Sequence, residues 1–399
     1  MAHLWLPFTQ MRGFDPRERT FVRGFGTALE DARGTRVYDA VSSIWTIVHG
    51  HCHPRIVDAI ASQAATLDHA TLLGATNPAA ETLAERLCAL AGMDRAFFAS
   101  DGASAVEAAI KMAAQYWQNA GQPQRRRFVR LSNAYHGDTI GAMSVSDVAL
   151  FKARFADLTF ETRAFDDRAA LGSDVAAVIV EPLIQVAAGM LLVDPAVYGA
   201  LCDIEPLLIV DEIATGFGRT ATMFGFEQTA LHPDILCLGK SITGGVLALS
   251  CALVRRRVYE AFLGDYHAFV HFFHGHSYAG NPIACAAALA SLDLFDEEQT
   301  LARAAGIADR AAVRLKGLRA HPLVRDARQA GAMIGVELRG DAIDPQGSLT
   351  PAWRVADGLY AAGHFTRPIG DVLQFVPPLC STDAEIDSFF DALENVLRE

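Results

Sequence analysis

The chain alternates short, wholly apolar runs with longer stretches in which apolar residues recur at helical spacing. Residues 175–180 and 207–210 are such runs, and each is followed by an acid, Glu181 and Asp211 respectively. A continuous apolar run is typical of a strand buried on both faces of a parallel sheet. Strands of this kind, separated by helical stretches, predict an α/β fold whose mainly parallel sheet carries a site at the carboxyl ends of its strands.

The two ends of the chain differ from this central pattern. The first forty-odd residues are rich in turn formers and end in the alternating segment 36–41, which predicts a half-exposed strand. A long alanine-rich helix begins near Pro282, and segments 324–327 and 332–338 then have the pattern of strands. We therefore expect three parts: an N-terminal arm with small-domain strands (1–46), a large domain (47–290) and a smaller α+β domain (291–399).

Composition narrows the range of partners. With 34 basic and 46 acidic residues, the formal net charge is -12, which argues against nucleic acid or an anionic membrane surface as the main partner. The seven cysteines include no Cys-x-x-Cys pair, which indicates reduced thiols. No stretch reaches the ~20 uninterrupted apolar residues that span a bilayer, and the N-terminus does not have the pattern of a signal peptide. We expect a cytoplasmic protein that binds no membrane.

The run that ends in Asp211 is followed by a second apolar run that leads to Lys240. The other lysines, Lys111, Lys152 and Lys316, do not follow a buried strand. An amine at the edge of the sheet would be partly desolvated, which lowers its pKa and makes it a competent nucleophile. An acid and an amine placed in this way suit pyridoxal phosphate (PLP), a cofactor with a cationic ring nitrogen and an aldehyde. An ordinary buried ion pair is the alternative.

Two further segments have the pattern of a cofactor site. A short strand at 95–99 runs into a turn of small residues that includes Gly102 and Ala103, and a helix follows with a capping box from Ser104 to Glu107. Free backbone N–H groups and the helix dipole make such a turn a phosphate cradle, although many turns in α/β proteins look the same.

Tyr135 follows another short strand, at residues 128–131. An aromatic side chain in this position could stack on a flat cofactor ring. The alternative is a surface turn with a packed tyrosine.

Histidines cluster at two places, at positions 49, 51 and 53 and at positions 271, 274 and 276. Metal binding has to be considered for both clusters, since alternate spacing on a strand puts three imidazoles on one side. No acid or thiolate recurs on that side, so we predict no metal site. Glycine and proline beside the first cluster indicate a turn packed near a site.

Taken together, the phosphate turn, the motif at 135–138, the pair at 181–182, the segment 211–220 and Lys240 resemble the class III aminotransferases of PLP fold type I. The resemblance covers nearly the whole chain. It implies the fold of the PLP-dependent transferases of type I, with a large, mainly parallel sheet domain and a smaller α+β domain.

The resemblance implies a set of cofactor-binding residues. Lys240 would hold the cofactor covalently and later carry the proton between substrate and cofactor, and Asp211 would keep the ring nitrogen protonated. Tyr135 would stack on the ring, and Gly102 with Ala103 would hold the phosphate. The same motifs place His136 and Glu181 in the cofactor site.

The resemblance also implies residues that bind substrate and a second subunit. Arg367 would bind the carboxylate of the keto acid, because a planar guanidinium suits two oxygens; a surface or salt-bridged arginine is the alternative. Trp45 would line the substrate channel. Ser277 would reach the phosphate of the other subunit, which implies a homodimer with shared active sites.

Within the class, four segments resemble the branch that aminates 8-amino-7-oxononanoate in biotin synthesis: 4–11, 135–139, 214–220 and 274–278. Enzymes of that branch that use S-adenosylmethionine as amino donor have Tyr, Trp and Tyr where this chain has Phe8, Ile44 and Gln374. These three residues are the predicted donor-binding positions. The surroundings of Phe8 and Arg367 are more similar to the enzymes that use lysine, so lysine is the expected donor and S-adenosylmethionine the alternative.

The chain departs from the family in small ways. Ala103 stands where Ser or Thr is common, which removes one side-chain hydrogen bond to the phosphate but leaves the backbone donors. The chain is also shorter than its relatives near 163–175 and 203–207, which affects helix lengths.

Two rival functions remain open. A class III transaminase acting on a different ω-amine or keto acid would share every cofactor residue, and a PLP aminomutase or racemase would return the amino group to its own substrate. A non-catalytic role is disfavoured because both Asp211 and Lys240 are present.

Overall fold

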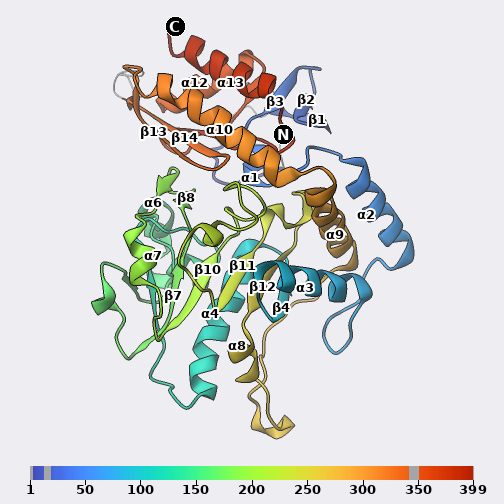
Figure 1. The fold of residues 1–399 in the computed structure, drawn as a ribbon, viewed down its shortest axis with the longest axis vertical. Coiled ribbons are helices and arrows are strands. Elements are labelled where there is room, and N and C mark those ends of the chain that lie inside the picture. The colour runs from blue at the N-terminus through green and yellow to red at the C-terminus, as the bar shows by residue number, and fades with distance from the viewer. Residues whose placement is uncertain (1–2, 13–18, 341–349, 399) are drawn as a thin grey trace.

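The computed structural model describes residues 3–12, 19–340 and 350–398. Its centre is a seven-stranded sheet in the order β4-β12-β11-β10-β7-β5-β6 (Figure 1). The pairs from β11 to β6 are all parallel, and β12 runs antiparallel to both of its neighbours. The strands are β4 (Arg95–Ala99), β5 (Arg127–Arg130), β6 (Thr162–Ala164), β7 (Val175–Val180), β10 (Leu207–Asp211), β11 (Ile235–Leu238) and β12 (Ser250–Val254). The predicted α/β fold with a mainly parallel sheet is confirmed.

The apolar runs are strands that are buried on both faces. Every residue of β7 and β10 is buried. Side chains of a strand alternate between the two faces, and in β10 Leu208 and Val210 pack into one apolar cluster while Leu207 and Ile209 pack into another. An apolar residue is therefore required at each position, which explains why the run shows no alternation.

Helices cover both faces of the sheet. Helix α4 (Gly102–Asn119) contributes Val106, Ala109 and Ile110 to the cluster on one face. The other face is covered by α3 (Pro78–Ala91) and α9 (Pro282–Glu297), and α2 (Pro54–Thr66) packs on α9. Shorter helices connect the strands: α5 (Ile140–Ser144), α6 (Ala149–Lys152), α7 (Ala196–Ala200) and α8 (Arg256–Glu260).

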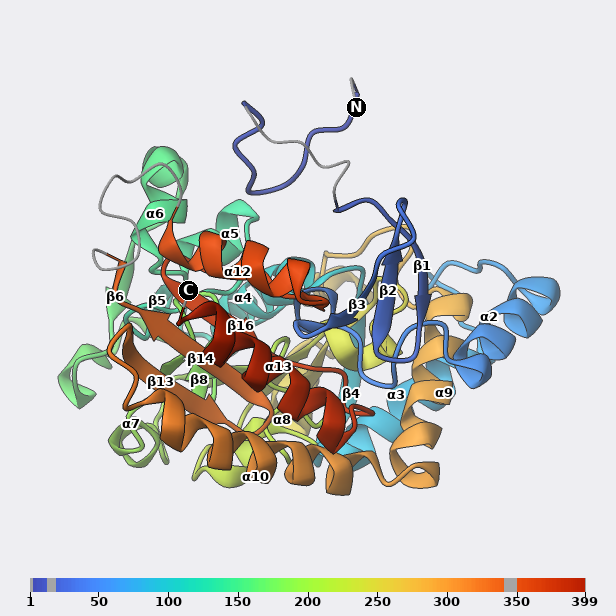
Figure 2. The same cartoon turned by 90° about the horizontal axis from the view of Figure 1, so that it is seen from above.

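The two ends of the chain form smaller sheets beside the large one (Figure 2). One has the order β1-β2-β3-β15 and joins the N-terminal strands to a C-terminal strand through the parallel pair of β3 and β15; the other has the order β13-β14-β16. The strands are β1 (Phe21–Phe25), β2 (Ala28–Asp31), β3 (Arg36–Asp39), β13 (Val324–Ala330), β14 (Met333–Leu338), β15 (His364–Phe365) and β16 (Val372–Phe375). A two-stranded hairpin, β8 (Ile184–Gln185) and β9 (Leu191–Leu192), completes the strands.

Helices α10 (Thr300–Leu318), α12 (Pro351–Ala361) and α13 (Asp383–Val396) pack beside the C-terminal strands. The predicted boundary between residues 290 and 291 falls inside α9, which is a continuous helix. We therefore propose that the change of domain comes at the end of that helix. Among the helices of the described ranges, none combines the length and apolarity needed to cross a bilayer.

The predicted capping box from Ser104 to Glu107 is wrong. The N-cap of α4 is Asp101, whose Oδ1 accepts a hydrogen bond from the backbone N–H of Ser104 at 3.0 Å. Glu107 instead accepts hydrogen bonds from the hydroxyl of Thr139 at 2.6 Å and the N–H of Gly141 at 2.7 Å. Aspartate is as good an N-cap as serine, and the observed cap lies three residues before the predicted one.

One turn of the chain has an unusual backbone. Element α1 (Ser42–Trp45) contains four successive residues with positive φ angles, between 46° and 67°. Left-handed helical geometry costs a residue with a side chain about 1–2 kcal/mol. The turn must therefore be held in place by its surroundings. One neighbour is Gly245, where an added Cβ would lie 2.3 Å from the carbonyl carbon of Thr46.

The close approach at Gly245 predicts the effect of a methyl group. Gly245→Ala should destabilise the protein by roughly 2–5 kcal/mol, because Gly245 has a φ of +90° and the new Cβ would clash with Thr46. Gly306→Ala is the matched control, since Gly306 lies within α10 with open space around it, and it should stabilise the protein by roughly 0.5–1 kcal/mol. Urea titration of both variants measures the difference; equal stabilities would contradict the packing described here.

Candidate active site

Three parallel strands bring their functional groups to one edge of the large sheet. Val210 of β10 pairs with Val180 of β7, and Asp211 pairs with Cys237 of β11. This register places Glu181, Asp211 and Lys240 around one cavity of about 430 Å³. The cavity is lined by Trp45, Asp101, Gly102, Ala103, Tyr135, His136, Gly137, Asp138, Thr139, Glu181, Val186, Ala187, Asp211, Ile213, Ala214, Thr215 and Lys240.

Asp211 is paired with His136 in the wall of the cavity. Nδ1 of His136 lies 2.7 Å from Oδ2 of Asp211, and both side chains are buried. Oδ1 of Asp211 accepts a hydrogen bond from the N–H of Ile213 at 3.0 Å. Nε2 of His136 is buried and has no hydrogen-bond partner within the described ranges. The histidine therefore fixes the carboxylate of Asp211 in position.

Lys240 lies at the start of the 3-10 helix that follows β11, and its φ angle is +42°. Strained backbone of this kind is concentrated at functional sites. Nζ of Lys240 is 5.0 Å from the centre of the Trp45 ring. Burial lowers the pKa of the Lys240 amine, and the carboxylates of Asp211 and Glu181 oppose that shift. A lysine with a lowered pKa has a larger fraction of the neutral, nucleophilic amine.

Glu181 and Tyr135 form the next layer of the site. Burial raises the pKa of Glu181 to about 7, and the nearby charge of Asp211 acts in the same direction. Oε2 of Glu181 accepts a hydrogen bond from the N–H of Tyr135 at 2.9 Å. The hydroxyl of Tyr135 donates to Oδ2 of Asp138 at 2.9 Å, and burial raises the pKa of this hydroxyl. Tyr135 is therefore held at both its backbone and its hydroxyl.

The N-terminus of α4 opens onto the same cavity. The first N–H groups of a helix have no partner within the helix, and the cap Asp101 satisfies only that of Ser104. The amides of Gly102 and Ala103 remain for a ligand, and the helix dipole favours an anion there. A Cβ at Gly102 would lie 2.8 Å from Cγ2 of Ile213, so only glycine fits. An anion cradle, a fixed carboxylate and an amine thus face one cavity, which suits a planar cofactor that carries a phosphate.

Eight of the predicted site residues line this cavity: Trp45, Gly102, Ala103, Tyr135, His136, Glu181, Asp211 and Lys240. Five others lie outside it: Phe8, Ile44, Ser277, Arg367 and Gln374. The structure thus brings together the residues predicted to bind the cofactor, except Ser277. Among the residues predicted to bind substrate, it brings only Trp45 to them.

Arg367 and Gln374 lie close to each other in the small domain. The guanidinium of Arg367 is half-buried, and burial lowers its pKa; it makes no hydrogen bond or ion pair with any residue of the described ranges. Gln374 is only 1% exposed. Its Oε1 accepts a hydrogen bond from Nε1 of Trp45 at 2.6 Å, and its Nε2 donates to the carbonyl of Arg367 at 2.6 Å. Gln374 thus connects Trp45 to the backbone of Arg367, and its amide does not face the cavity.

The other three predicted residues that do not line the cavity are Phe8, Ile44 and Ser277. Phe8 is 58% exposed, and its ring centre is 5.1 Å from that of Phe151. Ile44 packs against the apolar cluster that contains Trp45, to which Tyr135 also contributes. Ser277 is exposed, on the loop after the 3-10 helix Tyr266–Ala268.

Sequence reasoning did not single out some residues of the cavity wall. Val186 and Ala187 come from the hairpin between β8 and β9, and Ile213 and Ala214 follow Asp211. These apolar residues carry no chemical signal in the sequence. Asp138 could have been found, because it lies in the motif at 135–138 and can accept a hydrogen bond from a tyrosine three residues earlier.

The histidines of the first cluster, at positions 49, 51 and 53, make polar contacts with other side chains of the protein. Nε2 of His49 bonds to Ser291, and burial lowers the pKa of His49 to about 3. Nε2 of His51 contacts Asp39, and that of His53 contacts Glu298. Each ring thus has its own protein partner.

Comparison with known proteins agrees with the geometry. The family model described as aminotransferase class-III matches residues 10–397. Two proteins named adenosylmethionine-8-amino-7-oxononanoate aminotransferase are similar along the chain. The one from Aquifex aeolicus is 39% identical, with 100% of this chain and 96% of the relative covered. The one from Nitratidesulfovibrio vulgaris is 41% identical, with 99% and 80% covered.

Solved structures show the same relationship. An aminotransferase of the same name from Methanocaldococcus jannaschii has a TM-score of 0.93 at 35% identity, with 99% of this chain and 97% of that chain covered. A PLP-bound amine transaminase from an uncultivated Pseudomonas species has a TM-score of 0.91 at 32% identity, with 100% and 99% covered. The predicted family and fold type are confirmed: this chain belongs to the class III aminotransferases.

Proposed function

We propose that this aminotransferase works with pyridoxal phosphate held between Lys240 and Asp211. The observation that carries the proposal is that an amine and a carboxylate from neighbouring parallel strands face one cavity. They lie beside the N-terminus of α4, where the amides of Gly102 and Ala103 donate no hydrogen bond to another residue of the described ranges. The residues present therefore fit the aldehyde, the ring nitrogen and the phosphate of this cofactor.

When bound, pyridoxal phosphate supplies an aldehyde that takes up an amino group and a ring that draws electrons from the carbon losing its proton. The protein's residues do the rest. Asp211, fixed by His136, would keep the proton on the ring nitrogen. The Lys240 amine, with its lowered pKa, would take the proton from the substrate carbon and deliver it to the cofactor carbon that receives the amino group. Tyr135 would cover one face of the ring, and Trp45 would exclude water on the side of Lys240, since both residues line the cavity and Trp45 lies beside Nζ of Lys240.

The proposed acceptor is 8-amino-7-oxononanoate, which would be converted to 7,8-diaminononanoate in biotin synthesis. The relatives at 39–41% identity carry this acceptor in their names. The half-buried guanidinium of Arg367 supports a substrate with a carboxylate, because a desolvated cation without a partner is costly and an anion would offset that cost.

For the amino donor we propose lysine. Phe8 and Ile44 are apolar where the enzymes using S-adenosylmethionine have Tyr and Trp, and Gln374 is engaged in contacts within the protein. The names of the relatives favour S-adenosylmethionine, which is therefore the alternative. The amine transaminase with a TM-score of 0.91 supports a second candidate function, transamination of another amine.

We also propose that the enzyme works as a homodimer with shared active sites. Around Ser277 the chain exposes several aromatic side chains, which a second copy could cover. They are Tyr266 (77% exposed), Phe269 (58%), Phe273 (61%) and Tyr278 (65%).

The seven cysteines are all unpaired, which supports action in a reducing compartment, the cytoplasm.

Replacing the amine tests the cofactor assignment. Lys240→Ala should abolish the long-wavelength absorption of the lysine-bound cofactor and lower the rate by at least about 10²-fold, because the residue that moves the proton is lost. Lys152→Ala is the control, since Lys152 is also half-buried but bonds to the carbonyls of Ser144 and Ser146. An unchanged absorption band in Lys240→Ala would refute the assignment.

Removing the guanidinium tests the acceptor. Arg367→Met should raise the KM for 8-amino-7-oxononanoate by about 10–100-fold, the value of a charge-assisted hydrogen bond to a carboxylate. Arg325→Met, which removes an exposed arginine paired with Glu337, should leave KM unchanged. Steady-state kinetics of both variants give the comparison. An equal effect of the two substitutions would show that Arg367 does not bind the acceptor.

The donor can be identified with the purified holoenzyme. Lysine and S-adenosylmethionine are mixed with it separately, and the absorption of the lysine-bound cofactor is followed. We expect lysine to bleach the band. Bleaching by S-adenosylmethionine alone would overturn the lysine proposal, and bleaching by neither would contradict the assignment to biotin synthesis.

A further inference from the structure

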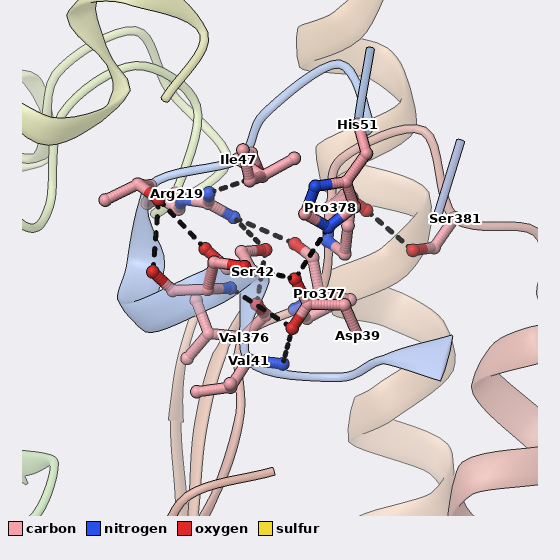
Figure 3. A network of polar contacts seen from close by, with 12 residues as sticks. Asp39, Val41, Ser42, Ile47, His51, Arg219, Val376, Pro377, Pro378 and Ser381 are labelled. Carbon is pink, nitrogen blue, oxygen red and sulfur yellow. Dashed lines mark hydrogen bonds and ion pairs between the residues drawn. The ribbon is translucent and has the colours of Figure 1, made fainter. Parts of the chain in front are cut away.

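The left-handed turn at Ser42–Trp45 is held by the carboxylate of Asp39. Oδ1 of Asp39 accepts hydrogen bonds from the N–H groups of Ser43 at 3.1 Å and Val41 at 3.4 Å. Oδ2 accepts a hydrogen bond from the hydroxyl of Ser43 at 2.9 Å, and it lies 2.9 Å from Nε2 of His51 (Figure 3). Both oxygens of one carboxylate are thus used to fix a backbone that its own residues disfavour.

A buried cation holds the same turn from the opposite side. The guanidinium of Arg219, which is 0% exposed, donates hydrogen bonds to the carbonyls of Ile47 at 2.7 Å and Pro377 at 2.8 Å and to the hydroxyl of Ser42 at 3.3 Å (Figure 3). Burial lowers the pKa of Arg219 to about 10, and the charge of Asp39 opposes that shift. Asp39 therefore both binds the turn and balances the charge of Arg219.

What the turn carries is the wall of the site. Trp45, its last residue, is 6% exposed, lines the cavity and lies 5.0 Å from Nζ of Lys240. Ile44, the residue before it, packs in the same apolar cluster. The orientation of both side chains depends on the positive φ angles of the turn, because an ordinary right-handed backbone would point them elsewhere.

We propose that Asp39, with His51, is a positioning residue that sets the part of the cavity wall formed by Trp45, where substrate is expected to bind. Neither Asp39 nor His51 lines the cavity, so both act through the turn. The proposal rests on the proposed function only in that Trp45 is taken to line the substrate channel. It concerns the binding of the amine and keto acid, and it leaves the grip of Lys240 and Asp211 on the cofactor unchanged.

The chain offers a matched control for a buried carboxylate. Asp31 is 2% exposed and lies in the same small sheet as Asp39. It accepts hydrogen bonds from the N–H groups of Arg33 and Thr35 and from the hydroxyl of Tyr360, and none of these belongs to the left-handed turn. Replacing either Asp31 or Asp39 by Asn could lower the stability of the fold. Only the substitution of Asp39 should change the environment of Trp45.

The direct test observes Trp45 itself. The four tryptophans, at positions 5, 45, 117 and 353, are labelled as 5-fluorotryptophan, and the ¹⁹F resonance of Trp45 is assigned with the variant Trp45→Phe. In the PLP-loaded protein, Asp39→Asn should shift or broaden the resonance of Trp45 while that of Trp117, which lies in α4, stays in place. Asp31→Asn should leave both unchanged. This readout needs no substrate, so it is independent of the donor and acceptor assignments.

Kinetics give the second readout. Asp39→Asn should raise the KM for the amine that bleaches the cofactor by about 10-fold or more, with kcat within about 3-fold and the Kd for pyridoxal phosphate unchanged. If Asp39→Asn does not fold, as a lost Trp117 resonance would show, Ser43→Ala removes only the hydroxyl bond to Asp39 and should give a smaller change in the same direction.

Three results would overturn the proposal. An unchanged Trp45 resonance in Asp39→Asn, or in Ser43→Ala where that variant replaces it, would show that the turn does not depend on the carboxylate. An equal change in Asp31→Asn would show a general effect on the fold. A fall in the affinity for pyridoxal phosphate with an unchanged KM for the amine would place the effect of Asp39 at the cofactor.

Discussion

The register of three buried parallel strands is the constraint on which the rest of the site depends. Because β7, β10 and β11 are apolar on both faces, they can lie only in the middle of the sheet, and their carboxyl ends must meet at one edge. The strand order alone therefore brings together Glu181, Asp211 and Lys240 around one cavity. The same burial that stabilises the sheet lowers the pKa of the Lys240 amine and raises that of Glu181.

Two parts of the site have a strained backbone. Lys240 and the four residues from Ser42 to Trp45 have positive φ angles, which residues with side chains disfavour. Such a backbone persists because the surroundings determine it more strongly than its own preferences do. Hydrogen bonds from Arg219 and to Asp39 hold this turn in place, and Gly245, which has no side chain, leaves room for its backbone. A rigid sheet edge thus holds the residues proposed to bind the cofactor, while the strained turn positions Trp45 in the cavity wall.

The sequence was informative where one local pattern decides the structure. The apolar runs before Glu181 and Asp211 predicted buried parallel strands, and the family resemblance predicted the fold that the structure shows. Long-range contacts could not be predicted. Residues 42–45 contain no glycine, so nothing local announces a left-handed turn. Gln374 is predicted to contact the amino donor, and its side-chain amide accepts a hydrogen bond from Nε1 of Trp45 and donates one to the carbonyl of Arg367. No local pattern announces the contact with Trp45, which is far away in the sequence.

The central claim is that Lys240 and Asp211 bind the same cofactor, Lys240 at its aldehyde and Asp211 at its ring nitrogen. A crystal structure of the protein grown with pyridoxal phosphate tests it most directly. The account predicts electron density continuous from Nζ of Lys240 to the cofactor, the ring nitrogen within hydrogen-bond distance of Asp211, and the phosphate at the amides of Gly102 and Ala103. Density joined to another lysine, or a ring whose nitrogen points away from Asp211, would contradict it.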